Sequence, residues 1–395
     1  MRTAALLILS LAQPRRFRGF HHFQQGAHFR THFWNVALIR RAESVMETVE
    51  AYSVRKKQEL DLLNHFLGDP LKIRSPRSVA EVIQQKFHLA AALKAEHVLH
   101  DWALTETAWT HSHRPRSGPF DFRYDYQRAD LEVRGPSFYG FEDQSGSNTV
   151  YTGSGMAAIS SLLMATASVF PEADIITMPN SYGETNELID GHAKHLNRIE
   201  LGRSLAEITH FHRPRPRILS LDSCTSAGAF EAIVKCVQPR LDLVVFDTTC
   251  FSGGSGHVVR ALNWARAATI PIVMLRSHTK LDSLGVEYGR LGSAVFAHGP
   301  HVGGAGQRLL QALLTEMRNA VRLFGGAALP AHFPPYVGAP AYRSLTNKRV
   351  AAMLRNNRRT MRHFSAALAG SSAELHFAHG LYVTLASART LDENG

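Results

Sequence analysis

Residues 149–275 alternate between short apolar segments typical of strands and longer segments with helical periodicity. The predicted strands are 149–151, 174–178, 218–221, 243–246 and 272–275. The predicted helices between them are 156–170, 184–196, 230–237 and 258–268. Strands that alternate with helices in this way form βαβ units. We therefore expect an α/β fold with a mainly parallel sheet and helices on both of its faces.

The positive charge of the chain is concentrated at its N-terminus. The formal net charge is +11, but residues 1–42 contain seven arginines and no acidic residue. Without these seven, the 44 basic residues become 37 against 33 acidic ones, and the net charge falls to +4. A nearly balanced body does not attract a polyanion, so we expect no nucleic-acid partner.

The chain has only three cysteines, Cys224, Cys236 and Cys250. Their number is odd and their spacing is not that of a metal site. We therefore predict neither a disulfide framework nor a bound metal. Such cysteine usage is typical of a reducing compartment and favours a cytoplasmic protein.

The first 45 residues allow three interpretations. Residues 3–12 imitate a short secretory signal, and the arginine-rich, acid-free stretch after them imitates a transit peptide. The third interpretation is that translation starts near Met46 and that the preceding residues are not native. A targeting segment thus stays open beside a cytoplasmic location. Because no stretch reaches the roughly 18 consecutive apolar residues of a spanning helix, we expect no membrane insertion.

Changes of pattern along the chain predict four regions. They are a basic N-terminal extension (1–45), a helical segment with a connecting arm (46–147), a large α/β domain (148–325) and a small, incomplete α+β domain (326–395).

Two of these regions have patterns of their own. In the N-terminal segment, Ser78 and Glu81 fit a capping box. Apolar residues then share one face of the expected helix: Val79, Val82, Ile83, Phe87, Ala90 and Leu93. In the C-terminal region, a basic helix at 346–368 precedes strands at 375–377 and 381–383.

Lys280 follows the apolar strand 272–275, within the sequence Arg276-Ser277-His278-Thr279-Lys280-Leu281-Asp282. Open α/β sheets bind their ligands at the carboxyl ends of the strands. A partly desolvated amine at that place is nucleophilic towards aldehydes. Lys280 is therefore a candidate for Schiff-base chemistry, and the alternative is a surface lysine in a turn.

A glycine-rich turn, Gly153-Ser154-Gly155-Met156-Ala157-Ala158, separates the first predicted strand from the first predicted helix. The free N–H groups and the dipole of a helix start stabilise a phosphate. The turn also fits the Gly-x-Gly-x-x-Ala pattern of dinucleotide sites, but Asp174 stands at the beginning of the next strand instead of its end. A phosphate site, a nicotinamide site and a purely structural turn remain as alternatives.

Two further side chains are expected at the carboxyl ends of strands. Asp247 follows strand 243–246, where a carboxylate can pair with a protonated ring nitrogen. Tyr182 follows strand 174–178, where an aromatic ring can stack on a cofactor. The alternatives are a helix-capping or turn aspartate and an ordinarily packed tyrosine.

Together, these motifs resemble the Cys/Met metabolism family of pyridoxal-phosphate (PLP) enzymes, which includes cystathionine γ-synthase and γ-lyase. The matching elements are Ser154-Gly155-Met156-Ala157-Ala158, Tyr182-Gly183-Glu184-Thr185-Asn186, Asp222-Ser223-Cys224-Thr225, Asp247-Thr248-Thr249 and Ser277-His278-Thr279-Lys280. Tyr126-Gln127-Arg128 also resembles the family's Tyr-Ser-Arg. The resemblance covers residues 120–385 and implies the fold type I architecture of PLP-dependent transferases.

The resemblance also implies roles for the matching residues. Lys280 would hold the PLP cofactor covalently and shuttle protons, Asp247 would pair with the pyridine nitrogen, and Tyr182 would stack on the ring. The residues implied to bind the phosphate are Ser154, Gly155, Met156, Ser277 and Thr279. Tyr126 and Arg128 would reach the phosphate site of a neighbouring subunit, which implies a homodimer or a homotetramer.

The implied activity is a lyase or γ-replacement and elimination reaction of the transsulfuration type on an amino-acid substrate. The chain departs from the family at Thr225-Ser226-Ala227, where the family has Thr-Asn-Pro, and in the glycine-rich loop at 252–256. The family's carboxylate-binding arginine is expected beyond Gly395, with Arg389 as a substitute. The alternatives are a PLP-dependent aminotransferase, an NAD(P)-binding oxidoreductase and a catalytically weakened homologue.

Overall fold

A computed structural model describes most of the chain from Thr48 onwards. The described residues are 48–107, 121–123, 132–134, 139, 148–202, 215–237, 240–282, 290–297, 303–328, 340–367, 371–376 and 382–387. Residues 1–45, Tyr126, Arg128 and Arg389 lie outside this part.

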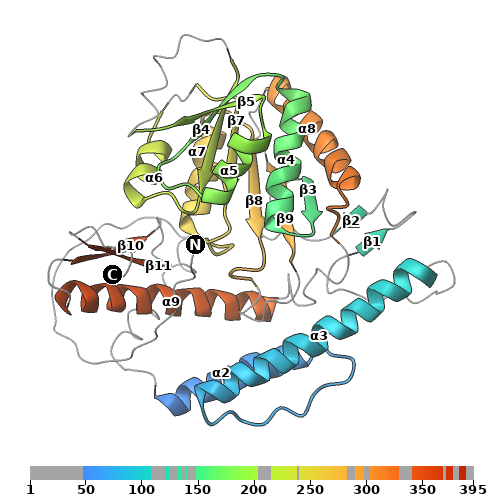
Figure 1. The fold of residues 1–395 in the computed structure, drawn as a ribbon, viewed down its shortest axis with the longest axis vertical. Coiled ribbons are helices and arrows are strands. Elements are labelled where there is room, and N and C mark those ends of the chain that lie inside the picture. The colour runs from blue at the N-terminus through green and yellow to red at the C-terminus, as the bar shows by residue number, and fades with distance from the viewer. Residues whose placement is uncertain are drawn as a thin grey trace, which may run out of the picture.

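A seven-stranded sheet with the order β3-β9-β8-β7-β6-β4-β5 lies at the centre of the described structure (Figure 1). Its strands are β3 (Asn148–Thr152), β4 (Ala173–Thr177), β5 (Leu196–Glu200), β6 (Arg217–Asp222), β7 (Leu243–Asp247), β8 (Ile272–Ser277) and β9 (Gly292–Ala297). Within this sheet, β9 runs antiparallel to β3 and β8, and the other neighbouring strands are parallel. The predicted α/β class with a mainly parallel sheet is confirmed.

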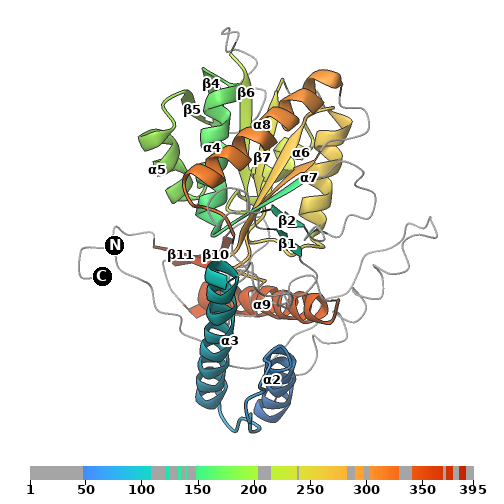
Figure 2. The same cartoon turned by 90° about the vertical axis from the view of Figure 1, so that its right-hand side faces the viewer.

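Helices cover both faces of the sheet (Figures 1 and 2). One face packs against α4 (Gly155–Val169), α5 (Gly183–His192) and α8 (Gly304–Leu323), and the other packs against α6 (Ala227–Val234) and α7 (Gly256–Ala267).

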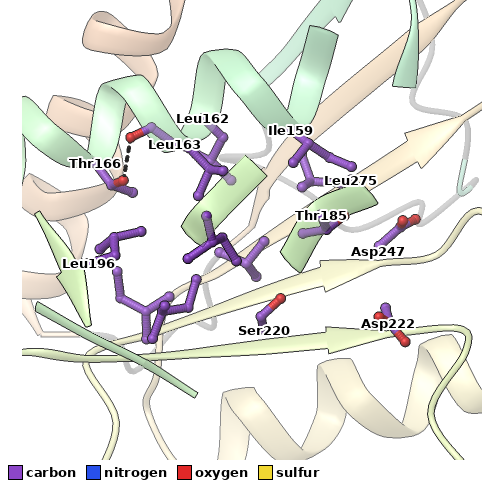
Figure 3. A pocket seen from close by; sticks show the side chains of 14 residues that line it. Ile159, Leu162, Leu163, Thr166, Thr185, Leu196, Ser220, Asp222, Asp247 and Leu275 are labelled. Carbon is purple, nitrogen blue, oxygen red and sulfur yellow. Dashed lines mark hydrogen bonds between the residues drawn. The ribbon is translucent and has the colours of Figure 1, made fainter. Parts of the chain in front are cut away.

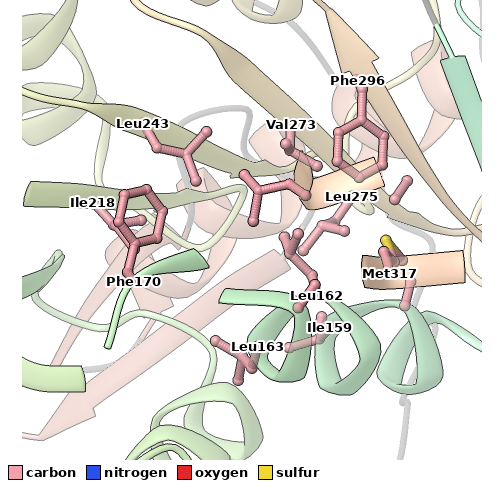
Figure 4. Packing of buried hydrophobic residues seen from close by; sticks show 14 of the residues in the cluster. Ile159, Leu162, Leu163, Phe170, Ile218, Leu243, Val273, Leu275, Phe296 and Met317 are labelled. Carbon is pink, nitrogen blue, oxygen red and sulfur yellow. The ribbon is translucent and has the colours of Figure 1, made fainter. Parts of the chain in front are cut away.

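Successive residues of the central strands belong to the two different cores, because side chains alternate across a strand. Val273 of β8 lies in the core with α4 and α8, and Met274 lies in the core with α6 and α7. Figure 4 shows the first core, which includes Leu162 of α4, Met317 of α8 and Phe296 of β9. Burying each such side chain contributes roughly 1.5–3 kcal/mol to folding.

Two strands of the sheet were not predicted from the sequence. The predicted helix 184–196 ends at His192, and Leu196 begins β5 instead. β5 is an edge strand with partly exposed polar residues, so it lacks the apolar run of the central strands. β9 contains small residues, and its pairing with β3 depends on contacts distant in the sequence.

The N-terminal segment contains two helices, α2 (Val49–Asn64) and α3 (Val79–Thr107). The predicted cap is present, since Ser78 Oγ accepts a hydrogen bond from the Glu81 N–H at 3.2 Å. The predicted buried face is partly wrong. Val82 and Leu93 are buried, whereas Ile83 is 49% and Phe87 is 71% exposed.

The C-terminal region contains α9 (Pro340–Ala367) and the antiparallel strands β10 (Ser371–His376) and β11 (Tyr382–Ser387). The helix predicted at 346–368 therefore begins earlier, at Pro340. In Figures 1 and 2, α2, α3 and α9 lie beneath the sheet, where Val350 of α9 packs against Leu281 after β8. The short strands β1 (Asp121–Arg123) and β2 (Glu132–Arg134) form a separate antiparallel pair. Among the described helices, none is both long and apolar enough to cross a membrane.

Candidate functional site

The predicted site residues of the described part lie at one edge of the sheet, where its parallel strands end. Asp247 is the last residue of β7, Lys280 lies three residues after the end of β8, and Tyr182 immediately precedes α5 after β4. Ser154 caps α4 just after β3, which runs in the same direction as β8. This edge is the usual ligand-binding edge of an open α/β sheet.

The start of α4 lies directly against the end of β8. Ser154 Oγ accepts a hydrogen bond from the Ala157 N–H at 3.0 Å. A Cβ atom on Gly155 would lie only 2.5 Å from the Cβ of Ser277, and one on Gly292 would lie 2.1 Å from the Ser154 carbonyl oxygen. Carbon atoms normally approach to about 3.5–4.0 Å. Glycine at position 155 thus allows the helix start to lie directly against the Ser277 side chain.

Asp247 is half-buried and is oriented by the residues that follow it. Its Oδ1 accepts a hydrogen bond from the Thr249 N–H at 2.8 Å, and Thr249 Oγ1 accepts one from the Ser277 N–H at 2.9 Å. Burial raises the pKa of Asp247 to about 6, the bonds to Thr249 oppose this shift, and the charge of Asp222 adds to it. A cation beside Asp247 would therefore stabilise its carboxylate form.

Asp222, at the end of the neighbouring strand β6, is paired in register with Asp247 but is buried and hydrogen-bonded to backbone groups. It accepts from the N–H groups of Tyr182 at 2.8 Å, Cys224 at 2.8 Å and Thr225 at 3.0 Å. Burial raises the pKa of Asp222, and these bonds lower it. The contact fixes Tyr182 at the start of α5. Burial also raises the pKa of Tyr182 to about 12, so that its hydroxyl is neutral at ordinary pH.

A pocket lies between the sheet and the helices α4 and α5 (Figure 3). Asp222 and Asp247 lie at one end of this pocket, and Leu162, Leu163 and Leu196 lie towards the other. The carboxylates thus form the polar end of an otherwise largely apolar space.

Lys280 lies in the turn that follows β8, and its side chain is exposed. Burial raises the pKa of the nearby Cys250 thiol, and the charge of Asp247 raises it further. The charges of Arg276 and Lys280 oppose this increase. Cys250 packs against the cluster of Leu281, the neighbour of Lys280, and follows Asp247 by three residues. The turns after the paired strands β7 and β8 therefore lie side by side. Thr279 is half-buried in the same turn as Lys280.

A buried ion pair that was not predicted from the sequence joins the two ends of this turn. Arg276, at 1% exposure, donates two hydrogen bonds to the carboxylate of Asp282, at 2.7 and 2.8 Å. It also donates to the carbonyl oxygens of Thr248 and Phe251, both at 2.7 Å. The signal in the sequence is an arginine at the end of an apolar strand with an aspartate six residues later.

His278 belongs to the same buried group. Its Nδ1 lies 3.0 Å from Asp282 Oδ2, and its Nε2 lies 2.8 Å from Ser293 Oγ on β9. Burial lowers the pKa of His278, which favours a neutral ring. In the described ranges, no three His, Cys, Asp or Glu side chains are grouped so as to hold a metal ion.

No protein-family model and no curated protein matches this sequence. Similar folds occur among solved structures. An aromatic amino acid aminotransferase from Burkholderia cenocepacia has 17% identity and a TM-score of 0.47, with 67% of this chain and 70% of that chain covered. An aromatic-amino-acid aminotransferase from Burkholderia pseudomallei, covalently bound to pyridoxal phosphate, has 14% identity and a TM-score of 0.47, with 81% and 80% covered.

An alanine aminotransferase from Pyrococcus furiosus has 13% identity and a TM-score of 0.46, with 85% of this chain and 81% of that chain covered. At such TM-scores the similarity does not bear on the chemistry of the site, which rests on the residues of this chain.

Proposed function

We propose that this chain is a PLP-dependent enzyme that acts on the amino group of an amino acid. The observation that carries the proposal is the meeting of four elements at one sheet edge: the α4 start against Ser277, Asp247 at the end of β7, Tyr182 before α5, and Lys280 after β8. These groups match a phosphate, a protonated ring nitrogen, an aromatic ring and an aldehyde.

The residues present fit this cofactor. The N–H groups of Gly155 and Met156, with the side chains of Ser154, Ser277 and Thr279, would hold the phosphate. Asp247 would hold the ring nitrogen, and the positive charge there would offset the burial that raises the pKa of Asp247. Tyr182 would cover the ring.

When bound, PLP acts as an electron sink for the bonds at the substrate α-carbon. Lys280 is the amine that would hold the cofactor aldehyde. Once released from the cofactor, its Nζ would take up and return the proton of the substrate. Asp247, which Thr249 orients, would keep the ring nitrogen protonated, because its negative charge favours the protonated form.

The nicotinamide alternative has weaker support. Asp174, the acid nearest to the expected ribose-binding position, lies at the start of β4 and accepts a hydrogen bond from Asn197 Nδ2 at 2.9 Å. The beginning of a parallel strand is at the sheet edge opposite to the ligand-binding one.

Two reaction classes are compatible with these residues. Transsulfuration-type elimination or replacement is implied by the resemblance to the Cys/Met metabolism family, but Ser226 stands where that family has an asparagine near the cofactor and the substrate. Because Ser226 departs from the pattern of the transsulfuration enzymes, we favour amino-group transfer as the first reaction to test. A released leaving group together with ammonia indicates elimination, a leaving group without ammonia indicates replacement, and a new amino acid formed from an added keto acid indicates transfer. A weakened homologue would form none of these products although it binds the cofactor.

Tyr126 and Arg128 carry the prediction of a homodimer or homotetramer, which stays a prediction because both residues lie outside the described part.

Absorbance spectroscopy tests the proposal. Adding PLP to the protein should give a saturable visible band, which the Lys280→Ala variant lacks. Lys235→Ala, which changes an exposed lysine after α6, is the matched control and should keep the band. A band that survives in Lys280→Ala, or no band in the unsubstituted protein, would contradict the proposal.

A further inference from the structure

The turn that carries Lys280 is closed by a buried group of charged and polar side chains. Arg276 is the residue before the last of β8, and Asp282 follows Lys280 by two residues. The two hydrogen bonds of 2.7 and 2.8 Å between Arg276 and Asp282 therefore close a loop of backbone around Lys280. His278, inside this loop, is bonded to Asp282 at 3.0 Å and to Ser293 of β9 at 2.8 Å.

The other side of the turn is also fixed. Leu281, the neighbour of Lys280, is 6% exposed and packs against Val350 of α9, with Cys250 nearby. Lys280 is thus an exposed side chain between the buried residues His278, Leu281 and Asp282.

Stability alone does not account for this arrangement. Removing two charges from water is costly, and apolar residues of similar volume often replace a buried ion pair without loss of stability. A fork of two N–H groups on a carboxylate does, however, fix orientation in a way that apolar packing cannot. The fully buried Arg276 donates four hydrogen bonds, two to the Asp282 carboxylate and two to backbone carbonyl oxygens.

We propose that Arg276, Asp282 and His278 are positioning residues that hold the Lys280 turn in the geometry needed for covalent attachment of the cofactor. The inference rests on the proposed function and adds residues that do not touch the cofactor themselves. A lysine side chain has many rotamers, so the backbone beneath it must be fixed for Nζ to meet one carbon atom. Misplacement of a reacting group by about 1 Å can lower a rate about 100-fold.

The test separates positioning from stability with two kinds of variant. Arg276→Met combined with Asp282→Leu removes the ion pair but keeps the volume buried. Ser293→Ala is the milder variant, since it removes only the bond between His278 and β9. Leu313→Ala in the α8 core is a control for lost stability, because Leu313 is fully buried away from the turn. Asp190→Asn is a control that breaks a two-bond pair with Arg198 on the surface.

Each protein is mixed with PLP, and samples are reduced with borohydride at timed intervals and digested. The amount of labelled Lys280 peptide, determined by mass spectrometry, gives the rate of attachment. Attachment condenses the amine with the aldehyde and releases one water. We expect the double variant to attach the cofactor at least tenfold more slowly, Ser293→Ala several-fold more slowly, and both controls at the unsubstituted rate. The circular dichroism of the cofactor band, per attached cofactor, should also fall in the double variant, because a loosely held ring loses its fixed asymmetric environment.

The outcomes are distinguishable. If the unsubstituted protein does not attach the cofactor, the proposed function and this inference both fail. If it does, and the double variant is folded with an unchanged rate and dichroism, the positioning role alone is overturned. If the double variant does not fold, Ser293→Ala decides: a rate equal to that of Leu313→Ala overturns the inference, and a slower rate supports it.

Discussion

Replacing Gly155 by alanine should displace the start of α4 from β8 and weaken both the fold and the phosphate site. The added Cβ would lie 2.5 Å from the Cβ of Ser277, 3.0 Å from its Cα and 3.2 Å from its Oγ. Since carbon atoms pack at about 3.5–4.0 Å, the helix start must retreat by about 1 Å. The backbone of β8 cannot yield easily, because its neighbours β7 and β9 hold it on both sides.

The size of both effects follows from this overlap. Overpacking of this kind costs roughly 1–3 kcal/mol in the free energy of unfolding. A hydrogen bond to a charged group contributes about 1.5–3 kcal/mol, so loss of one phosphate contact should raise the Kd for PLP by about 10- to 100-fold.

The assay combines urea unfolding of the protein without cofactor with a PLP titration followed by absorbance. Gly228→Ala is the matched control, because Gly228 is in the first turn of α6 and a Cβ there meets no atom within 4 Å. It should keep the cofactor affinity and leave stability unchanged or improved by up to about 1 kcal/mol. Equal behaviour of the two variants would refute the close packing of α4 on Ser277 and, with it, the phosphate cradle.

Substitutions at three further positions have defined outcomes. Asp247→Asn should stabilise the cofactor-free protein. Folding raises the pKa of Asp247 from 3.8 to about 6, so its ionised form opposes folding at neutral pH. The gain in urea unfolding should be roughly 1–2 kcal/mol at pH 7.5, after allowance for partial exposure, and should vanish towards pH 4; a gain independent of pH would contradict this cause. The same variant should slow turnover, which unchanged product formation would disprove. Tyr182→Ala should weaken PLP binding about tenfold through lost stacking, whereas Tyr182→Phe should not, and equal Kd values for the two would exclude a ring contact. Thr249→Val should lower the free energy of unfolding by about 1–2 kcal/mol, since it leaves the Ser277 N–H without its acceptor; wild-type stability would show that the N–H finds another partner.

The central sheet was predictable where local pattern and tertiary environment agree. The apolar run before Arg276 predicted β8, because a strand buried on both faces is apolar throughout. The end of this strand then predicted the position of Lys280. β5 was missed because an edge strand can be partly polar, and β9 because nothing local reveals an antiparallel strand between β3 and β8.

The other differences between prediction and structure depend on which elements and side chains pack against each other. The periodicity of residues 79–93 predicted the helix α3, but α3 has more apolar side chains than its contact with α2 can bury. Leu89 and Leu93 are buried in this contact, whereas Phe87 stays exposed. The Arg276 and Asp282 pair was invisible for a similar reason. Charged residues are usually exposed, and only the fold shows that these two are buried together.

The most direct measurement is the site at which borohydride fixes the cofactor to the protein. After incubation with PLP and reduction, peptide mass mapping should find the pyridoxyl label on Lys280 in stoichiometric amount, and competition with pyridoxamine phosphate should prevent labelling because it occupies the same phosphate and ring contacts. A label spread over exposed lysines such as Lys194 and Lys235, or one that pyridoxamine phosphate leaves unchanged, would contradict a cofactor site at this edge of the sheet.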